Sequence, residues 1–238
     1  MTDETPVIEI VDVTKNYGGL RPLRMRRLVM GSRERLAVSG LDAGGAETLV
    51  HLITGASVPD AGTVRVAGRD TREIATDTEW LASLDRFGIV TRRAVLIESL
   101  SIVANLALPM TLSIDPMAPD TRAAVEALAD AVGLSLSRLD APASSLTPGE
   151  LVRVHLARAL AMKPELLLLE HPTAAIEDQA VSEDLGRTLL AAASAREVGW
   201  LALTEDAAFI RASTSTARRL APATGELSGA SWWKKLVR

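Results

Sequence analysis

The chain has 238 residues, of which 47% are hydrophobic, and it carries 26 basic against 30 acidic side chains for a net charge of −4. This composition supports one large domain with a sizeable core, and it excludes long disorder and a strongly basic nucleic-acid binder. The absence of cysteine excludes disulfides, thiol catalysis and zinc held by thiolates. Of the basic residues 22 are arginine, and no lysine lies between Lys15 and Lys163.

The first half of the chain alternates short strand patterns with turns. Strands are predicted over residues 7–13, 35–39, 63–67 and 87–90, from alternating or short apolar runs. A glycine-rich segment, residues 40–45, follows the second of these strands, and apolar residues at helical spacing then indicate a helix that ends at Gly55. The order strand, glycine loop, helix is therefore expected near position 40.

The second half is richer in helix patterns. Helices are predicted over residues 101–108, 123–132, 151–162 and 179–193, and strands over 166–169, 200–204 and 217–220. This order predicts a mostly parallel α/β core with a helical insertion.

The first six residues lack a signal-peptide layout, and no apolar run approaches the roughly 20 residues that cross a bilayer, so a soluble, cytoplasmic protein is expected. The tail at Trp232 and Trp233 could pack on the protein, a partner or a lipid surface.

Several short motifs occur in a characteristic order. They are the segment 11–19 with Tyr17, residues 52–55 and 59–64, residues 100–109, residues 156–169, and Pro172-Thr173. Together they resemble the ATP-binding cassette (ABC) subunit of an ABC transporter over roughly residues 7–227. The resemblance implies a P-loop NTPase fold of ABC type. The expected core covers about residues 1–91 and 163–227, with a helical subdomain over about 92–162 and a tail over 228–238.

The glycine-rich loop departs from the family pattern at its two charged or hydroxyl positions. In a P-loop the backbone amides cradle phosphates, a lysine neutralises them and a hydroxyl binds Mg²⁺. Ala46 stands at the lysine position and Glu47 at the hydroxyl position. A carboxylate about 4 Å from a phosphate costs on the order of 4 kcal/mol at an effective dielectric constant of 20. The resemblance assigns nucleotide contacts to Tyr17, Gly40, Gly45, Ala46, Glu47 and Thr48.

The other family motifs are altered as well. The resemblance places Arg92 at the Q-loop glutamine and Thr147 and Gly149 in the signature motif, all three as nucleotide contacts. It places Glu170 at the Walker B aspartate, His171 at the catalytic glutamate and Glu205 at the switch histidine. These last three residues are the candidate catalytic group, and Glu47 with Glu170 is a possible Mg²⁺ pair.

Each motif also has a purely structural interpretation. Residues 40–48 could be a turn that binds nothing, and Tyr17 could pack over the sheet edge instead of stacking on adenine. Glu170 and His171 could be a satisfied buried pair. Residues 146–150 could simply start a helix, with Thr147 as N-cap, a proline at the first helical position and Glu150 at the third.

The sequence therefore favours a degenerate cassette subunit of a bacterial ABC transport system, with weak or absent binding of ATP and Mg²⁺. The resemblance implies a structural or regulatory role at the inner face of the membrane. The implied partners are a transmembrane permease subunit and either a second copy or an active cassette subunit, with no nucleic acid. Two alternatives stay open. One is a working ATPase that uses Glu47 and Glu170 for Mg²⁺ and His171 as base; the other is a standalone interaction protein.

Overall fold

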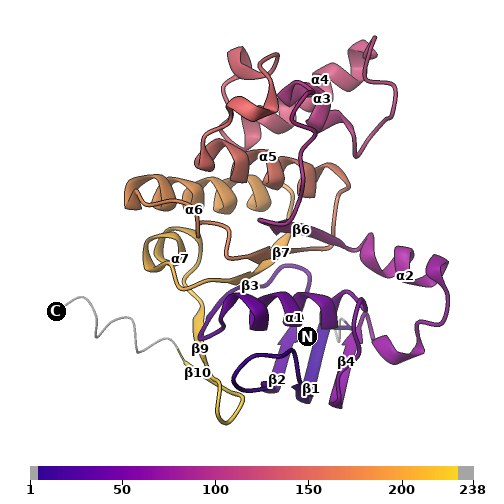
Figure 1. Cartoon of the computed structure of the whole chain (residues 1–238), viewed down its shortest axis with the longest axis vertical. Helices are drawn as coiled ribbons and strands as arrows, with labels where there is room; N and C mark the ends of the chain where they lie inside the picture. The colour runs from indigo at the N-terminus through magenta and orange to yellow at the C-terminus, as the bar shows by residue number, and fades with distance from the viewer. Residues whose placement is uncertain (1–4, 230–238) are drawn as a thin grey trace.

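A computed structural model describes residues 5–229, and it consists of two sheets and a set of helices (Figure 1). The strands are β1 (Ile8–Lys15), β2 (Leu23–Met30), β3 (Arg35–Ser39), β4 (Ala61–Val66), β5 (Arg69–Asp70), β6 (Phe87–Thr91), β7 (Leu166–Glu170), β8 (Gly199–Leu203), β9 (Ala217–Ala221) and β10 (Glu226–Ser228). The helices are α1 (Ala43–Ile53), α2 (Asp77–Leu84), α3 (Ile102–Ala107), α4 (Pro119–Ala131), α5 (Pro148–Ala161), α6 (Gln179–Ser194) and α7 (Ala207–Ser213). Short 3-10 helices cover Thr71–Glu73, Leu136–Arg138 and Ala143–Ser145.

The larger sheet has the order β10-β9-β3-β8-β7-β6. Its strands β3 and β6 to β9 pair in parallel, and β10 closes the edge as an antiparallel partner of β9. The smaller sheet is antiparallel, in the order β2-β1-β4-β5. Because β3, β6, β7 and β8 run in parallel, their carboxyl ends meet at one edge, which is where open α/β sheets carry their sites.

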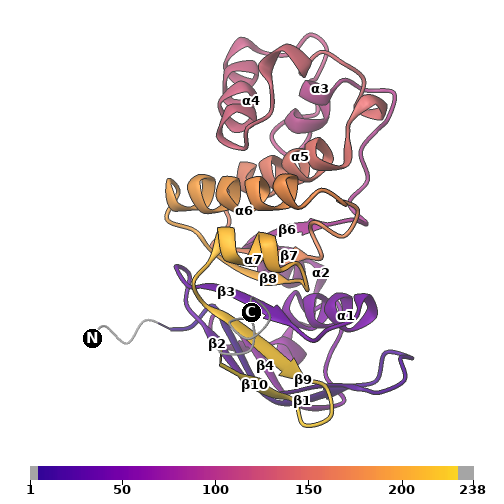
Figure 2. The ribbon, with the colours of Figure 1, turned by 90° about the vertical axis from the view of Figure 1, so that its left-hand side faces the viewer.

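The parallel strands send alternate side chains into two separate cores. Leu167 and Leu169 of β7 belong to one hydrophobic cluster, whereas Leu166 and Leu168 belong to the other. The first cluster joins the sheet to α3, α4, α5 and α6, and the second joins it to α1 and the antiparallel sheet. Figure 2 shows this layering, with α6 and the helices above it on one side and α1 and the smaller sheet on the other. A strand buried on both faces reads as a continuous apolar run, as 166–169 does.

The helices α3, α4 and α5, which we call the helical lobe, lie between β6 and β7 in the chain and form the upper part of Figure 1. Three helices begin earlier than the apolar pattern indicates. Asp42 caps α1 within the glycine-rich segment, and Pro119 and Pro148 start α4 and α5. Capping residues and N-terminal prolines, and not apolar periodicity, therefore set these boundaries.

Besides the short strands β5 and β10 and the 3-10 helices, three elements lie outside the sequence-based expectations, namely β2, α2 and α7. In β2 the alternation is interrupted because the neighbours Arg26 and Arg27 are both exposed. Helix α2 has no buried residue and is instead held by a capping box between Thr76 and Glu79. Helix α7 is short and capped by Asp206. None of the helices within residues 5–229 has the length and apolar character needed to cross a bilayer.

The tail at Trp232 and Trp233 lies outside the described residues.

Candidate nucleotide site

The glycine-rich loop connects the end of β3 to the start of α1. Gly40 has φ +91°, and a Cβ built there would lie 2.2 Å from the carbonyl oxygen of Leu220. Only glycine avoids that contact, so the fold itself requires this residue. Asp42 then caps the helix, because its Oδ1 accepts a hydrogen bond of 2.7 Å from the Gly45 amide. A carboxylate of the protein thus lies at the amides that a phosphate would use at a helix N-terminus.

Tyr17 packs onto this loop from the other side. Its hydroxyl lies 3.1 and 3.2 Å from the two carboxylate oxygens of Asp42. A Cβ built on Gly44 would lie 3.0 Å from the Tyr17 ring, so the ring is in direct contact with the glycine backbone. Burial, and then the hydrogen bond and charge of Asp42, raise the pKa of the Tyr17 phenol. The aromatic ring that resembles the family's adenine platform therefore covers the loop itself.

The first turn of α1 carries the substituted positions. Ala46 is fully buried in the hydrophobic core, and the Thr48 hydroxyl donates to the Gly44 carbonyl at 2.7 Å. Thr48 therefore satisfies its hydrogen bond within the helix. Glu47 has a side chain that is 41% exposed, and its carboxylate lies 3.9 Å from His51 one turn later.

Arg93 lies between the two glutamates of the site. One of its amino groups forms an ion pair with Glu47 on α1, and Nη2 donates to Glu170 Oε2 at the end of β7 across 2.6 Å. The Glu170 side chain is only 10% exposed, whereas that of Arg93 is 39% exposed. The guanidinium therefore neutralises a carboxylate that would otherwise be buried without a partner.

The sequence pointed to Arg92, and the structure brings its neighbour into the site instead. A turn follows β6, closed by the Ala94 amide on the Thr91 carbonyl at 3.2 Å, and the Thr91 hydroxyl also accepts from the Arg93 amide at 3.3 Å. This turn directs Arg93 inward. Arg92 is exposed, and within residues 5–229 it forms no hydrogen bond or ion pair. The order of two adjacent arginines along the chain carries no signal of which one turns in.

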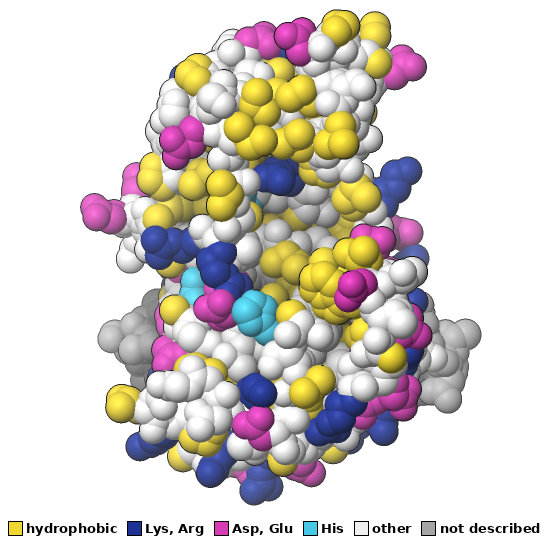
Figure 3. All heavy atoms as spheres, turned by 45° about the vertical axis from the view of Figure 1, so that its right-hand side comes forward, with side chains coloured by type: hydrophobic (Ala, Val, Ile, Leu, Met, Phe, Trp, Pro, Cys, Tyr) yellow, Lys and Arg dark blue, Asp and Glu magenta, His cyan; other side chains and the backbone are white. Residues whose placement is uncertain are grey.

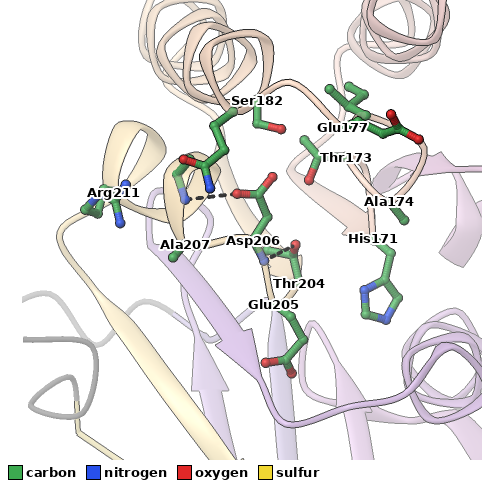
Figure 4. Close-up of a pocket in the computed structure, with 13 residues that line it drawn as sticks. His171, Thr173, Ala174, Glu177, Ser182, Thr204, Glu205, Asp206, Ala207 and Arg211 are labelled. Carbon is green, nitrogen blue, oxygen red and sulfur yellow. Dashed lines mark hydrogen bonds between the residues drawn. The ribbon is translucent and has the colours of Figure 1, made fainter. Parts of the chain in front are cut away.

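Glu205 and His171 follow the ends of β8 and β7. The Glu205 carboxylate accepts a hydrogen bond from the Gly40 amide, at the first residue of the glycine-rich loop. His171 has a left-handed backbone, with φ 42°, fixed by a 2.8 Å hydrogen bond from its amide to the Leu203 carbonyl. Its Nε2 is buried and has no hydrogen-bond partner among the described residues. Both residues line a cavity of about 500 Å³ that also includes Thr173, Glu177 and Arg211 (Figure 4).

The residues aligned with the family signature lie elsewhere, at the start of α5 in the helical lobe. Thr147 and Glu150 form a capping box. The Thr147 amide and hydroxyl each donate to Glu150 Oε2 at 2.9 Å, and the Glu150 amide donates to the Thr147 hydroxyl oxygen at 3.3 Å. The Thr147 amide and hydroxyl, with the charge of Arg138, hold the pKa of the Glu150 carboxyl below its usual range. A Cβ built on Gly149 would lie 3.0 Å from Val181. The Thr147 hydroxyl and the Glu150 carboxylate thus have partners within the chain.

The site thus brings together Tyr17, Gly40, Asp42, Gly45, Glu47, Arg93, Glu170 and Glu205. To bind a nucleoside triphosphate with Mg²⁺, the site would need a cation at the loop for the phosphates and free carboxylate oxygens for the metal ion. The amide of Gly45 is taken by Asp42, and the carboxylates of Glu47 and Glu170 are taken by Arg93. Within residues 5–229 there is no group of three His, Asp or Glu side chains that could hold a metal ion. These residues do not fit Mg²⁺-nucleotide in the arrangement seen here.

Two residues of this site, Asp42 and Arg93, were absent from the sequence-based candidates. Asp42 could have been found, because an aspartate directly before a helix start is a common N-cap. Its contact with Tyr17, 25 positions earlier, has no local signal.

A loop of this kind between a parallel strand and a helix, at the carboxyl edge of the sheet, defines a P-loop nucleoside triphosphatase fold. The family model "ABC transporter" matches residues 25–174. The chain is 33% identical over 183 residues to the lipoprotein-releasing system ATP-binding protein of Anaeromyxobacter dehalogenans, covering 75% of this chain and 76% of that protein. This chain therefore belongs to the ABC transporter family, as one of its ATP-binding cassette domains, and the predicted fold class is confirmed.

Other relatives are longer or more distant. The chain is 32% identical over 186 residues to the macrolide export ATP-binding/permease protein of Aeromonas hydrophila; the match covers 76% of this chain but only 28% of that protein. Among solved structures, a dimeric ATP-binding cassette bound to ADP and Pi matches with a TM-score of 0.74 at 21% identity, over 93% of this chain and 98% of that one. A cassette from Clostridium perfringens, part of the cbiONQ transporter complex, gives a TM-score of 0.75 at 20% identity, over 94% and 88% of the two chains. These structures support the fold alone.

Proposed function

We propose that this chain is a degenerate ATP-binding cassette subunit of a bacterial ABC transport system, with weak or lost nucleotide binding and a structural or regulatory role. The observation that carries the proposal is the Arg93 bridge between Glu47 and Glu170. The protein's own guanidinium lies between the two acidic side chains that align with the family's Mg²⁺ ligands. Glu170, His171 and Glu205, the family-equivalent catalytic positions, are therefore proposed to have lost catalysis.

Electrostatics support weak binding of a polyanion. The loop lacks the lysine that neutralises phosphate, and its helix amides already face the Asp42 carboxylate. Each added carboxylate within about 4 Å of a phosphate costs on the order of 4 kcal/mol at an effective dielectric constant of 20. Two such terms total about 8 kcal/mol, which is comparable to the whole binding free energy of a micromolar ligand.

The partner is proposed to be a transmembrane permease subunit, bound at a groove between β6 and α5. This groove, of about 240 Å³, is lined by Phe87, Ile89, His155 and Met162 among others. Figure 3 shows a hollow between the helical lobe and the core with hydrophobic side chains gathered around it. His155 is only 5% exposed, and its Nε2 has no hydrogen-bond partner among the described residues. An apolar groove with one unmet polar atom suits a segment of another protein.

The subunit is further proposed to lie at the inner face of the cell membrane and to divide into a core, about residues 1–91 and 163–227, and a helical subdomain, about 92–162. It would pair with a second copy or with an active cassette subunit. The capping box at Thr147 uses the groups that would otherwise face a partner's nucleotide. This favours a partner that does not depend on contacts from this motif.

Calorimetric titration of the purified chain with ATP and Mg²⁺ tests the proposal. We expect a Kd weaker than about 1 mM, which corresponds to less than about 4 kcal/mol. An intact relative, such as the lipoprotein-releasing cassette with 33% identity, serves as the positive control. Micromolar affinity, or Mg²⁺-dependent ATP turnover that Glu170→Ala abolishes, would overturn the proposal.

One observation favours a second candidate, a working ATPase with substituted groups. His171 lines the cavity beside Glu205, and its Nε2 has no hydrogen-bond partner among residues 5–229, so no other side chain there occupies the imidazole that would act as the base. This candidate predicts that His171→Ala removes a turnover that the wild type shows. A standalone interaction protein predicts neither turnover nor association with a permease.

A further inference from the structure

The loop that carries Arg93 joins the core to the helical lobe. It begins at the end of β6 and continues to Ser101, the N-cap of α3. Its first part touches the nucleotide site through the ion pairs of Arg93 with Glu47 and Glu170. The loop therefore contacts three elements of the core within a few residues: β6, α1 and β7.

The remainder of the loop is fastened to the helical lobe. The Asn105 side chain on α3 accepts from the Ile97 amide at 2.8 Å and donates to the Ile97 carbonyl at 3.0 Å. Asn105 is fully buried. On α5, Arg158 donates to the Val95 carbonyl at 3.1 Å. In this connection between core and lobe, a single residue therefore separates Arg93, which is paired with the core, from Val95, which is bonded to the lobe.

We propose that Arg93 is an internal latch that fixes the helical lobe relative to the glycine-rich loop in the absence of nucleotide. Its planar guanidinium offers donors on two sides and so reaches a carboxylate on each neighbouring element at once. Arg93 is a positioning residue, and it acts on the lobe through the loop. The inference rests on the proposed function in one respect only, that no nucleotide competes for Glu47 and Glu170.

The chain offers a matched control for this latch in the adjacent arginine. Arg92 has the same charge and sits on the same turn, yet it is exposed and forms no hydrogen bond or ion pair within residues 5–229. Replacing either arginine by glutamine removes one positive charge from the same surface. Only the Arg93 variant removes the bridge, so a difference between the two variants isolates the latch from a change in net charge.

Hydrogen exchange of the full, nucleotide-free chain, followed by mass spectrometry, tests the proposal. In Arg93→Gln we expect the amides of residues 94–101 to exchange about tenfold faster, because local opening loses the two ion pairs that oppose it. In Arg92→Gln we expect wild-type exchange. Equal exchange in residues 94–101 for the two variants would overturn the latch.

A second variant keeps the test decisive if Arg93→Gln does not fold. Glu47→Gln removes one arm of the bridge at an exposed side chain and leaves the buried Glu170 paired with Arg93. Exchange faster than wild type in residues 94–101 supports the latch, and unchanged exchange contradicts it. Because no nucleotide is added, a failed latch leaves the weak ATP binding of the proposed function intact. Tight ATP binding of the wild type would, conversely, reject that function without altering these exchange rates.

Discussion

At the scale of single residues, the glycines of the loop have an architectural reason to be present. Gly40 combines a positive φ with a backbone contact that no side chain could tolerate. Gly44 differs, because it lies in the first turn of α1 and its nearest neighbour is the ring of Tyr17. The fold therefore requires Gly40 independently of any role in phosphate binding.

Replacing Gly40 and Gly44 in turn separates the backbone constraint at Gly40 from the side-chain contact at Gly44. Gly40→Ala should lower the free energy of unfolding by roughly 2–4 kcal/mol, because alanine is strained at positive φ and its Cβ meets the Leu220 carbonyl. Gly44→Ala should change it by less than about 1 kcal/mol, since the gain in helix propensity offsets a small shift of Tyr17. Urea denaturation measures both. Similar losses for the two variants would contradict this view of the loop.

His155 is a second residue whose environment predicts a measurable effect. Burial, and then the charge of Arg158, lower the pKa of His155 from 6.5 to about 4. The unfolded chain therefore binds this proton first as the pH falls, so the stability associated with the neutral imidazole is present above pH 6.5 and lost between pH 6.5 and 4.

The test compares the wild type with His155→Leu at pH 7 and pH 5. Linkage predicts that the wild type loses roughly 2 kcal/mol more of its unfolding free energy over this interval than the variant does. Urea denaturation at the two pH values measures the difference. An identical pH dependence of the two proteins would show that His155 is not the titrating group.

At the scale of elements, α5 shows how a motif position can be used by local structure. Thr147 caps the helix, Pro148 occupies its first turn and Glu150 completes the capping box. The same residues align with the family signature, so the sequence alone left both interpretations open. The hydrogen bonds of the box favour the local role, because they use the Thr147 hydroxyl within the chain.

Substitution at the N-cap of α5 tests this local role. Thr147→Ala should lower the free energy of unfolding by about 1 kcal/mol, the usual cost of losing a side-chain cap. Thr147→Ser keeps the accepting oxygen and should remain close to the wild type. Thermal and urea denaturation of the three proteins give the comparison. A harmless Thr147→Ala would mean that the cap contributes little to the fold.

At the scale of the whole molecule, one hydrophobic cluster joins the helical lobe to the parallel sheet. It includes Leu106 of α3, Val154 of α5, Leu169 of β7 and Trp200 of β8. The lobe therefore has no separate core of its own. Because loss of the lobe would expose apolar surface of the sheet, lobe and core should unfold together.

A substitution that creates a cavity in the helical lobe tests whether lobe and core unfold together. Leu106 is fully buried, and Leu106→Ala should cost roughly 2–5 kcal/mol. We expect a single transition in which circular dichroism and tryptophan fluorescence shift by the same amount. Leu112, which is 88% exposed, provides the control, and Leu112→Ala should be nearly neutral. Two separate transitions would show that the lobe unfolds independently.

Much of the fold could be predicted from local patterns. The strand predicted over residues 35–39 coincides with β3, which is a short and continuously buried run. The helix predicted from residue 179 coincides with the start of α6, whose buried residues recur at helical spacing. Strand β2 could not be predicted in this way, since its alternation of buried and exposed residues breaks at two adjacent exposed arginines, Arg26 and Arg27. Helix α2 lacks a buried face and so gives no periodic signal.

The candidate site divides in the same way. The sequence by itself determined the cassette fold and the absence of a lysine at position 46, because both depend on residue identity at known spacing along the chain. Only the tertiary structure decided that Arg93, and not Arg92, bridges Glu47 and Glu170, and that Tyr17 covers the loop through Asp42. Glu170 lies 77 positions from Arg93, so the contact depends on a turn and on strand register across the sheet. No local pattern encodes either.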